Sequence, residues 1–422
     1  MEITMLGEAR YPSPLNYHVS DQARVPFRVV IDPDAPPREE LYFEVAGPRE
    51  KLFFDPARTR AGIVTCGGLC PGINNVIRSL VLQLHHGYGV REILGFVDGY
   101  QGLDPWRGTE PIPLTPEFVE DIHKEGGTVL NTSRGPVDFG VAVDNLIRRK
   151  VNILFVVGGD GTQRGGAELF REAESRGYAL SVVGIPKTID NDVAFVTRTF
   201  GYATAVTEAT KILTCAHTEA HSVKNGISLV KIMGRNAGFI AAGATVASQE
   251  VNFTLVPEVP FVLEGENGFL DALKKRIERR AHAVILVAEG AGQHLMTGGE
   301  EERDASGNVR LKDIGIFLRD RIDACFKAGK IPFVLRYFDP SYTIRSVPAC
   351  AEDAVLCDFY ARNAAHAAMA GKTGLVIGQH HGVFTHVPID LLAGQKKQLD
   401  LDSPAWRGAL ASTGQNFARF PA

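Results

Sequence analysis

Two apolar runs that end in polar segments limit the possible folds of this chain more than any other feature. The first, FVVGGDGT at residues 155–162, carries Asp160, and the second, GIPKTIDND at residues 184–192, carries Asp190 and Asp192. If each run is a buried strand, two strand ends deliver three carboxylates and several backbone amides to one place. This combination is typical of a site for magnesium, phosphate and a hydroxyl nucleophile.

Strand patterns alternate with helix patterns along most of the chain. At residues 60–84 a β-branched run, a glycine loop and an amphipathic segment follow one another, and similar units extend to residue 192. This alternation predicts an α/β fold with mainly parallel sheets and right-handed crossovers. Ligands of such folds bind beyond the carboxyl ends of the strands, where the glycine and carboxylate segments lie.

At 422 residues the chain exceeds the usual size of one domain, so we expect two Rossmann-like lobes with a substrate cleft between them. Residues 1–55, rich in Pro, Asp, Glu and Arg, are predicted to be an extension that packs on the body or covers a subunit surface. The first lobe is expected to comprise residues 56–202 and 349–395, and the second residues 203–348 and 396–422.

The composition narrows the classes of partner. Charged residues make up 22% and hydrophobic residues 45%, and the net charge is -4, so nucleic acid or a membrane surface is not expected as a partner. No apolar run approaches roughly 18 residues and the N-terminus lacks signal-peptide features, which predicts a cytoplasmic location. The six scattered cysteines favour reduced thiols over disulfides or a metal site.

Each polar segment also has a plain structural interpretation. Gly67 and Gly68 can offer amides to a phosphate, or can merely let a strand turn. Asp160 can hold magnesium or cap a helix. Residues two apart in an extended segment share a face, so Asp190 and Asp192 can enter one pocket, where their like charges raise one pKa and favour a base. The alternative is an Asx-rich turn without chemistry.

Basic side chains in loops and at strand ends can hold an anionic substrate. Arg forks suit phosphate monoesters, although each cation taken singly is equally explained as a surface ion pair. The candidates are Arg134, Lys187, Arg235, Arg336 and Arg345. The histidines of GQHHGVFTHV, at residues 378–387, are unevenly placed for a metal, and we expect ordinary packing and surface roles for them.

Five segments in order resemble the phosphofructokinase family, most closely its plant-like branch. They are TCGGLCPGINNVIR, GGDGTQRGG, PKTIDND, IMGRNAGFIA and DPSYTIRS, and the resemblance covers about residues 55–395. It implies magnesium-dependent phosphoryl transfer to the 1-hydroxyl of fructose 6-phosphate, giving fructose 1,6-bisphosphate in glycolysis. The first lobe would bind ATP and magnesium and the second fructose 6-phosphate. A homodimer or homotetramer is also implied.

The resemblance implies roles for individual residues. Asp190 matches the general base, Thr188 and Asp192 match its neighbours at the reacting groups, and Asp160 matches the magnesium residue. The nucleotide side matches Gly67, Gly68, Tyr100, Arg134, Gly135, Gly159, Gly161 and Thr162. The sugar-phosphate side matches Met233, Gly234, Arg235, Glu289, Arg336, Tyr342 and Arg345. Arg235 is also expected to steady the transferring phosphoryl group.

Several positions bear on the phosphoryl donor and on subunit contacts. The best-known bacterial branch has Arg where Gly226 stands, as a contact across a subunit boundary, and His where Tyr342 stands. Lys187 is Gly in that branch and Lys in pyrophosphate-dependent relatives, which favours pyrophosphate. Pyrophosphate users have Asp where this chain has Gly161, and glycine leaves space for the α-phosphate of a nucleotide. Plant-like ATP users have both residues, so ATP is the predicted donor.

Three other functions compete with this prediction. The first is a pyrophosphate-dependent fructose 6-phosphate 1-phosphotransferase. The second is a non-catalytic regulatory subunit. The intact site residues argue against it: Asp160, Thr188, Asp190, Asp192 and Arg235. The third is a lipid or NAD kinase, which shares a GGDGT loop but has no counterpart of TIDND or MGR.

Overall fold

The computed structural model describes residues 2–30, 40–133, 135–296, 298, 302, 309–392, 394–415 and 417. The chain folds into two compact units. Unit 1 comprises Met1–Thr188, Val193–Gly201 and Ser346–Lys396, and unit 2 comprises Ile189–Asp192, Tyr202–Arg345 and Lys397–Ala422. Unit 1 has a mixed sheet with a parallel centre and unit 2 a parallel sheet, each with helices on it, which confirms the predicted α/β class. None of the described helices is long and apolar enough to cross a membrane.

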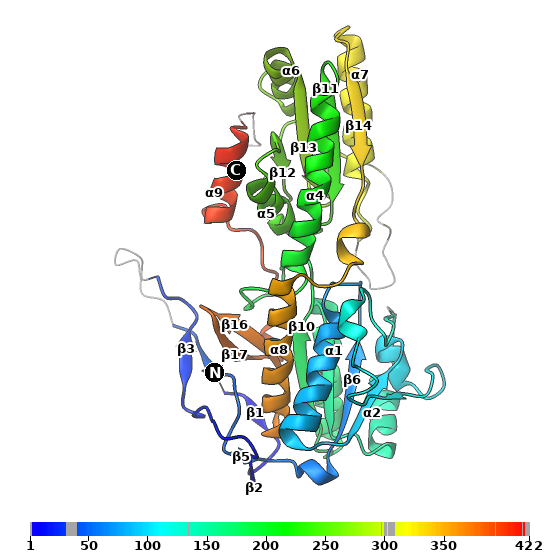
Figure 1. The fold of residues 1–422 in the computed structure, drawn as a ribbon, viewed down its shortest axis with the longest axis vertical. Coiled ribbons are helices and arrows are strands. Elements are labelled where there is room, and N and C mark those ends of the chain that lie inside the picture. The colour runs from blue at the N-terminus through cyan, green and yellow to red at the C-terminus, as the bar shows by residue number, and fades with distance from the viewer. Residues whose placement is uncertain are drawn as a thin grey trace. The chain divides into compact units, whose positions relative to one another are not determined.

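In the described part of unit 1, nine strands form one sheet in the order β3-β4-β17-β16-β10-β9-β6-β7-β8 (Figure 1). The pairs from β16 to β7 are parallel, and the flanking pairs are antiparallel. The bounds are β3 (Arg24–Pro26), β4 (Tyr42–Val45), β6 (Arg60–Thr65), β7 (Glu92–Phe96), β8 (Ile112–Pro113), β9 (Ile153–Gly158), β10 (Ser181–Pro186), β16 (Leu375–His380) and β17 (Val383–Pro388). Two short antiparallel pairs complete the unit: β1 (Thr4–Met5) with β15 (Lys372–Thr373), and β2 (Tyr11–Pro12) with β5 (Lys51–Leu52).

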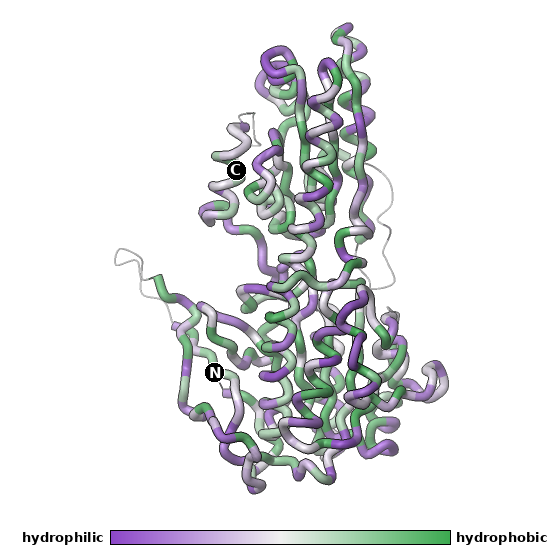
Figure 2. Tube along the Cα trace, in the orientation of Figure 1, coloured by the Kyte–Doolittle hydropathy of each residue, from purple (hydrophilic) through white to green (hydrophobic). Residues whose placement is uncertain are grey.

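Helices bury this sheet. The helix α1 (Ile73–Leu82) packs beside α8 (Ala351–Met369), and α2 (Phe139–Arg148) packs beside α3 (Asp160–Ser175). Leu154 and Val156 of β9 share a hydrophobic cluster with residues of α2 and α3. All six residues of β9 are buried, so both faces of the strand are covered and its sequence is a continuous apolar run. In Figure 2 hydrophobic colour follows the central strands of the unit.

In the described part of unit 2, four parallel strands form a sheet in the order β12-β13-β11-β14. The bounds are β11 (Gly226–Ile232), β12 (Phe253–Leu255), β13 (His282–Ala288) and β14 (Val334–Phe338). Leu229 and Ile285 share a core with residues of α6 (Phe269–Arg280) and α7 (Ile314–Ala328). On the opposite face Ser228 donates a hydrogen bond to α4 (Tyr202–His221). The helices α5 (Phe239–Ser248) and α9 (Pro404–Thr413) pack against each other.

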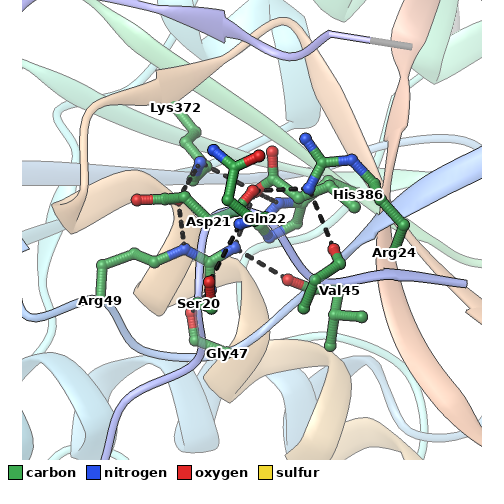
Figure 3. A network of polar contacts seen from close by, with 11 residues as sticks. Ser20, Asp21, Gln22, Arg24, Val45, Gly47, Arg49, Lys372 and His386 are labelled. Carbon is green, nitrogen blue, oxygen red and sulfur yellow. Dashed lines mark hydrogen bonds and ion pairs between the residues drawn. The ribbon is translucent and has the colours of Figure 1, made fainter.

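A buried polar network ties the N-terminal residues to the sheet of unit 1 (Figure 3). Glu44 on β4 accepts hydrogen bonds from Arg49 at 2.7 Å and His386 at 2.9 Å, and it pairs with Lys372 at 2.8 Å. Asp21 pairs with Arg49 at 2.7 Å and with Lys372 at 2.9 Å. Burial alone would raise the pKa of Glu44, but His386 and Lys372 outweigh it and hold this pKa well below its usual range. The N-terminal residues are therefore an integral part of unit 1.

The histidines near β17 also contact N-terminal residues. His380 stacks on Phe43 with ring centroids 4.6 Å apart, and His381 forms a hydrogen bond of 3.1 Å with the carbonyl of Phe27. The described residues contain no group of three His, Cys, Asp or Glu side chains that could hold a metal ion.

We expect Glu44→Gln to lower the free energy of unfolding by ~3–5 kcal/mol at pH 7, because Arg49 and Lys372 stay buried and lose a charge partner. The pKa of Glu44 is depressed in the folded state, so its contribution is present above the ordinary carboxyl pKa and is lost as pH falls through the lowered one. Urea unfolding measures the effect. The exposed Glu50→Gln is the matched control, and equal stabilities of the two variants would contradict the prediction.

Candidate active site

Three loops at the carboxyl ends of neighbouring parallel strands meet around Lys187 in unit 1. Lys187 follows β10 and is buried, and its ammonium donates a hydrogen bond of 2.5 Å to the carbonyl of Gly68, which follows β6. Its backbone amide donates to the carbonyl of Gly158 at the end of β9, at 3.0 Å. Gly67 has a φ of +85°, which favours glycine, and a side chain there would point at the ammonium. Thr188 is fixed next to it by Thr199, whose hydroxyl donates to its carbonyl at 2.7 Å.

The segment GGDGT at residues 158–162 leads directly from β9 into a helix. The helix α3 begins at Asp160, with Gly159 as its N-cap, so Asp160, Gly161 and Thr162 form its first turn. The first amides of a helix have no helical partner and lie at the positive end of its dipole, so this turn can bind an anion. The Asp160 side chain is 35% exposed and pairs with Arg164 at 3.4 Å, one turn further along the helix.

Tyr100 packs tightly against α3. Its hydroxyl donates a hydrogen bond of 2.5 Å to the carbonyl of Thr162. A Cβ atom at Gly165 would lie 2.5 Å from its ring, so only glycine lets the ring approach the helix this closely. Burial raises the pKa of Tyr100 well above its usual value, so the phenol stays a hydrogen-bond donor.

A cavity of about 530 Å³ opens beside Tyr100 and the first turn of α3. Its walls combine apolar side chains, among them Val137, Phe139 and Ile389, with basic and acidic ones. The charged side chains are Arg164, Glu168, Arg171 and Asp390, and Arg171 pairs with both acidic residues. Gly135 and Gly161 also line it, and a Cβ atom at Gly161 would meet nothing closer than Arg164, at 3.8 Å. The space above Gly161 is therefore open. Arg134 lies outside the described residues.

In unit 2, Asp190 and Asp192 lie on a turn rather than on the predicted extended segment. Asn191 between them has a φ of +55°, so the alternation of an extended strand does not apply. The turn still brings the two carboxyl groups close enough for the charge of Asp192 to raise the pKa of Asp190. The predicted proximity holds, but its predicted cause was wrong.

The pKa of Asp190 is raised well above its usual value, with burial as the largest cause. The carboxylates of Asp192 and Glu289 raise it further. A hydrogen bond from the backbone of Arg235 and the charge of Arg345 act in the opposite direction. A carboxylate with this raised proton affinity is suited to general-base chemistry.

The loops after β11 and β13 bring Arg235 and Glu289 together. The amide of Glu289 donates to the carbonyl of Ile232 at 2.9 Å, and that of Gly290 donates to Gly234 at 3.1 Å. A Cβ atom at Gly290 would lie 1.9 Å from the carbonyl oxygen of Arg235, so the two loops touch backbone to backbone. Burial raises the pKa of Glu289, against the charge of Arg235. Met233 lies in the same β11 loop.

The remaining sugar-side candidates differ in their surroundings. The guanidinium of Arg345 lies 5.0 Å from the ring centroid of Tyr342, which is 72% exposed. Arg336 on β14 is exposed and pairs with Glu219 of α4 at 3.7 Å. The structure therefore places Arg345 in the electrostatic environment of Asp190, and Arg336 in an exposed ion pair.

Sequence reasoning missed several residues of these sites. Arg164 was detectable, because a helix that starts at Asp160 places a residue four positions later on the same face. Ile389 had no detectable signal, since it reaches the cavity from a segment more than two hundred residues away from Asp160.

Comparison with known proteins shows the family of this chain. A family model described as phosphofructokinase matches residues 60–368. The chain belongs to the phosphofructokinase family. The ATP-dependent 6-phosphofructokinase of Borreliella burgdorferi is 45% identical over 430 residues, which cover 98% of this chain and 96% of that protein. ATP-dependent 6-phosphofructokinase 7 of Arabidopsis thaliana is 44% identical, over 96% of this chain and 85% of that protein.

A solved structure of similar fold is the pyrophosphate-dependent phosphofructokinase of Marinobacter aquaeolei. It has a TM-score of 0.68 at 19% identity and covers 86% of this chain and 93% of its own. At this identity the similarity shows a shared fold alone. The fold and the phosphofructokinase resemblance predicted from the sequence are confirmed.

Gly226 explains one departure from the bacterial pattern of the phosphofructokinase family. It begins β11, and a Cβ atom there would lie 2.1 Å from the carbonyl oxygen of Ala220. Backbone cannot yield as a flexible side chain does, so this turn has no room for the arginine of the bacterial branch.

We expect Gly226→Ala to lower the free energy of unfolding by ~1–3 kcal/mol, because the backbone between α4 and β11 must shift to admit the new methyl group. Gly329→Ala is the control, since its Cβ atom would meet its nearest neighbour at an ordinary 3.4 Å. Chemical denaturation compares the two variants. A Gly226→Ala protein as stable as the control would show that the turn accommodates a side chain.

Proposed function

We propose that this chain is an ATP-dependent 6-phosphofructokinase, which transfers the γ-phosphoryl group of ATP to the 1-hydroxyl of fructose 6-phosphate. The observation that carries the proposal is Asp190, with a buried Oδ1 atom and a raised pKa, in a chain that is 45% identical over almost its whole length to a protein of that name. Arg235 and Glu289 both act on this pKa. The product is fructose 1,6-bisphosphate, so the enzyme is a glycolytic kinase.

In the proposed reaction Asp190 accepts the proton of the 1-hydroxyl group as its oxygen attacks the γ-phosphorus. The bond between that phosphorus and the bridging oxygen of ATP breaks, and ADP leaves. Burial and like charges make Asp190 more basic than an exposed carboxylate. Arg235 and Lys187 are proposed to stabilise the negative charge of the transferred group.

The nucleotide is proposed to bind in unit 1. The apolar walls formed by Val137, Phe139 and Ile389 suit a purine ring, and the first turn of α3 suits its phosphates. The open space at Gly161 supports a nucleotide over pyrophosphate, because it leaves room for an α-phosphate. Gly67, Gly68, Gly135 and Gly159 are proposed to line the phosphate path, and a phosphate contact of Arg134 stays a prediction from the sequence.

Asp160 is the proposed magnesium residue. Magnesium keeps several waters and commonly binds proteins through one or two carboxylates plus substrate phosphates. The partly exposed carboxylate of Asp160 at the start of α3 fits this mode. The ion, when bound, would neutralise charge on the donor phosphates. Arg164, which also lines the cavity, is proposed to hold the Asp160 carboxylate in place.

Fructose 6-phosphate is proposed to bind in unit 2. Glu289, Met233 and Gly234 lie in the two loops that contact each other, and their neighbour Arg345 supplies a cation for the 6-phosphate. Tyr342 and Arg336 remain proposed contacts. Assembly as a homodimer or homotetramer and a cytoplasmic location stay predictions from the sequence.

We expect Asp190→Ala to lower kcat by ~10²–10⁴-fold while the protein stays folded and still binds fructose 6-phosphate, since only the base is lost. In the wild type, kcat should fall as pH drops through the raised pKa of Asp190, above the range of an ordinary aspartate. Fructose 1,6-bisphosphate formation is measured across pH, with substrate binding checked by calorimetry. Near-normal turnover of the variant would refute the base assignment.

We expect Gly161→Asp to weaken use of ATP by ~10-fold or more in kcat/KM, because a second carboxylate fills the open space and repels the α-phosphate. Both proteins are assayed with fructose 6-phosphate, magnesium and either ATP or pyrophosphate. Gly161→Ala is the matched control, since a methyl group fits that space. Wild-type activity with pyrophosphate alone would favour the phosphotransferase, and inactivity with both donors would favour a regulatory subunit.

A further inference from the structure

The segment in which the chain re-enters unit 2 lies against the turn that carries the proposed base. The backbone amide of Lys397 donates a hydrogen bond of 3.2 Å to the carbonyl of Asp192. Its ammonium lies 5.0 Å from the ring centroid of Phe239, the first residue of α5. Lys397 therefore contacts the Asp190–Asp192 turn through its backbone and reaches the start of a helix with its side chain.

Glu258 fixes this segment from the other side. Its carboxylate accepts the amide of Leu399 at 2.8 Å and the amide of Gly238, the N-cap of α5, at 2.9 Å. Leu399 itself is buried. One carboxylate thus joins the residue two positions after Lys397 to the residue immediately before Phe239. Glu258 therefore fixes both the segment that carries Lys397 and the segment that carries Phe239. This limits the freedom of Lys397 to move away from Asp192.

The side chain of Lys397 interacts electrostatically with a site carboxylate. Burial lowers its pKa to about 8, and the charge of Asp192 acts in the opposite direction. The ammonium is thus mainly charged at pH 7. Contact with an aromatic face compensates a cation for part of its lost hydration. Asp190, Asp192 and Glu289 are three carboxyl groups that interact electrostatically, or with groups in common, so an additional cation near Asp192 offsets part of the repulsion between their ionised forms.

We propose that Lys397 is a positioning residue for phosphoryl transfer: it anchors the Asp190–Asp192 turn through its backbone and keeps Asp192 ionised through its ammonium. Asp192 then stays charged beside Asp190 and maintains the proton affinity of the base. This inference rests on the proposed function, because it assigns a reason for the ionisation of the pair that the reaction uses. Lys397 acts through Asp192 and does not itself take the proton.

The test compares Lys397→Met, which keeps length and removes charge, with Lys397→Arg, which keeps charge. Lys396→Met is the matched control, because Lys396 is the adjacent exposed lysine and gives the same change in net charge. We expect Lys397→Met to lower kcat by ~10-fold or more with KM for both substrates within about 3-fold. Lys397→Arg should retain most of kcat, and Lys396→Met should match the wild type.

The pH profile separates positioning from general loss of structure. Removal of a neighbouring cation favours the neutral form of Asp192, and a neutral Asp192 no longer raises the pKa of Asp190, so the acidic limb of kcat should move to lower pH in Lys397→Met. Glu289, Arg235 and Arg345, which also act on Asp190, are unchanged in this variant. Thermal unfolding checks that the variants fold. If Lys397→Met does not fold, Phe239→Leu replaces it, and the loss of the ring should produce a smaller shift in the same direction.

Wild-type kcat and pH profile in Lys397→Met would overturn the inference, as would equal losses in the Met and Arg variants, which would indicate a role for shape rather than charge. Asp190→Ala is measured in parallel. An inactive Asp190→Ala beside an unaffected Lys397→Met overturns this inference alone, whereas an active Asp190→Ala overturns the proposed base first.

Discussion

The proposed chemistry depends on the balance of charges around one buried carboxylate. Burial, Asp192 and Glu289 raise the proton affinity of Asp190, and the backbone of Arg235 and the charge of Arg345 reduce it. A carboxylate exposed to water would be too weak a base for a sugar hydroxyl, and one surrounded only by negative charge would be protonated before the reaction. The opposing groups limit the rise in the pKa of Asp190, which stays more basic than an exposed aspartate.

Neighbouring parallel strands place the site residues of each unit close together. In unit 2, β11 and β13 lie side by side, so the loops after them place Arg235 and Glu289 next to each other although more than fifty residues separate them. The contact is backbone to backbone at Gly290, which a larger residue would prevent. In unit 1, Lys187 connects the loops after β6, β9 and β10 by hydrogen bonds to two carbonyl groups. Gly290 is thus required where the loops after β11 and β13 meet. Lys187 alone connects the three loops of unit 1.

The sequence was sufficient for the features that depend on local pattern. Apolar runs such as 153–158 are strands whose two faces are both covered, so their sequences are continuously apolar. The polar residues that follow them lie at the carboxyl ends of the strands, where ligands of α/β folds bind. Features that depend on tertiary contacts could not be predicted. Tyr100 packs on Gly165 of α3, and an ionic network around Glu44 joins the N-terminal strands to the sheet. Neither contact has a signal in the surrounding sequence.

The path of the chain explains why a lysine near residue 400 belongs to this site. Unit 2 contains Ile189–Asp192, is left again at Arg345 and is re-entered at Lys397. Each of these crossing points carries a side chain that acts on the carboxylate pair: Asp190 and Asp192 themselves, Arg345, and Lys397. Where the chain re-enters unit 2, backbone amides donate hydrogen bonds to residues of that unit. Lys397 donates to the carbonyl of Asp192, and Leu399 donates to the carboxylate of Glu258. The ionisation of the base is therefore coupled to the connections of the chain, and of the groups that act on the pair only Asp192 lies in the local sequence TIDND.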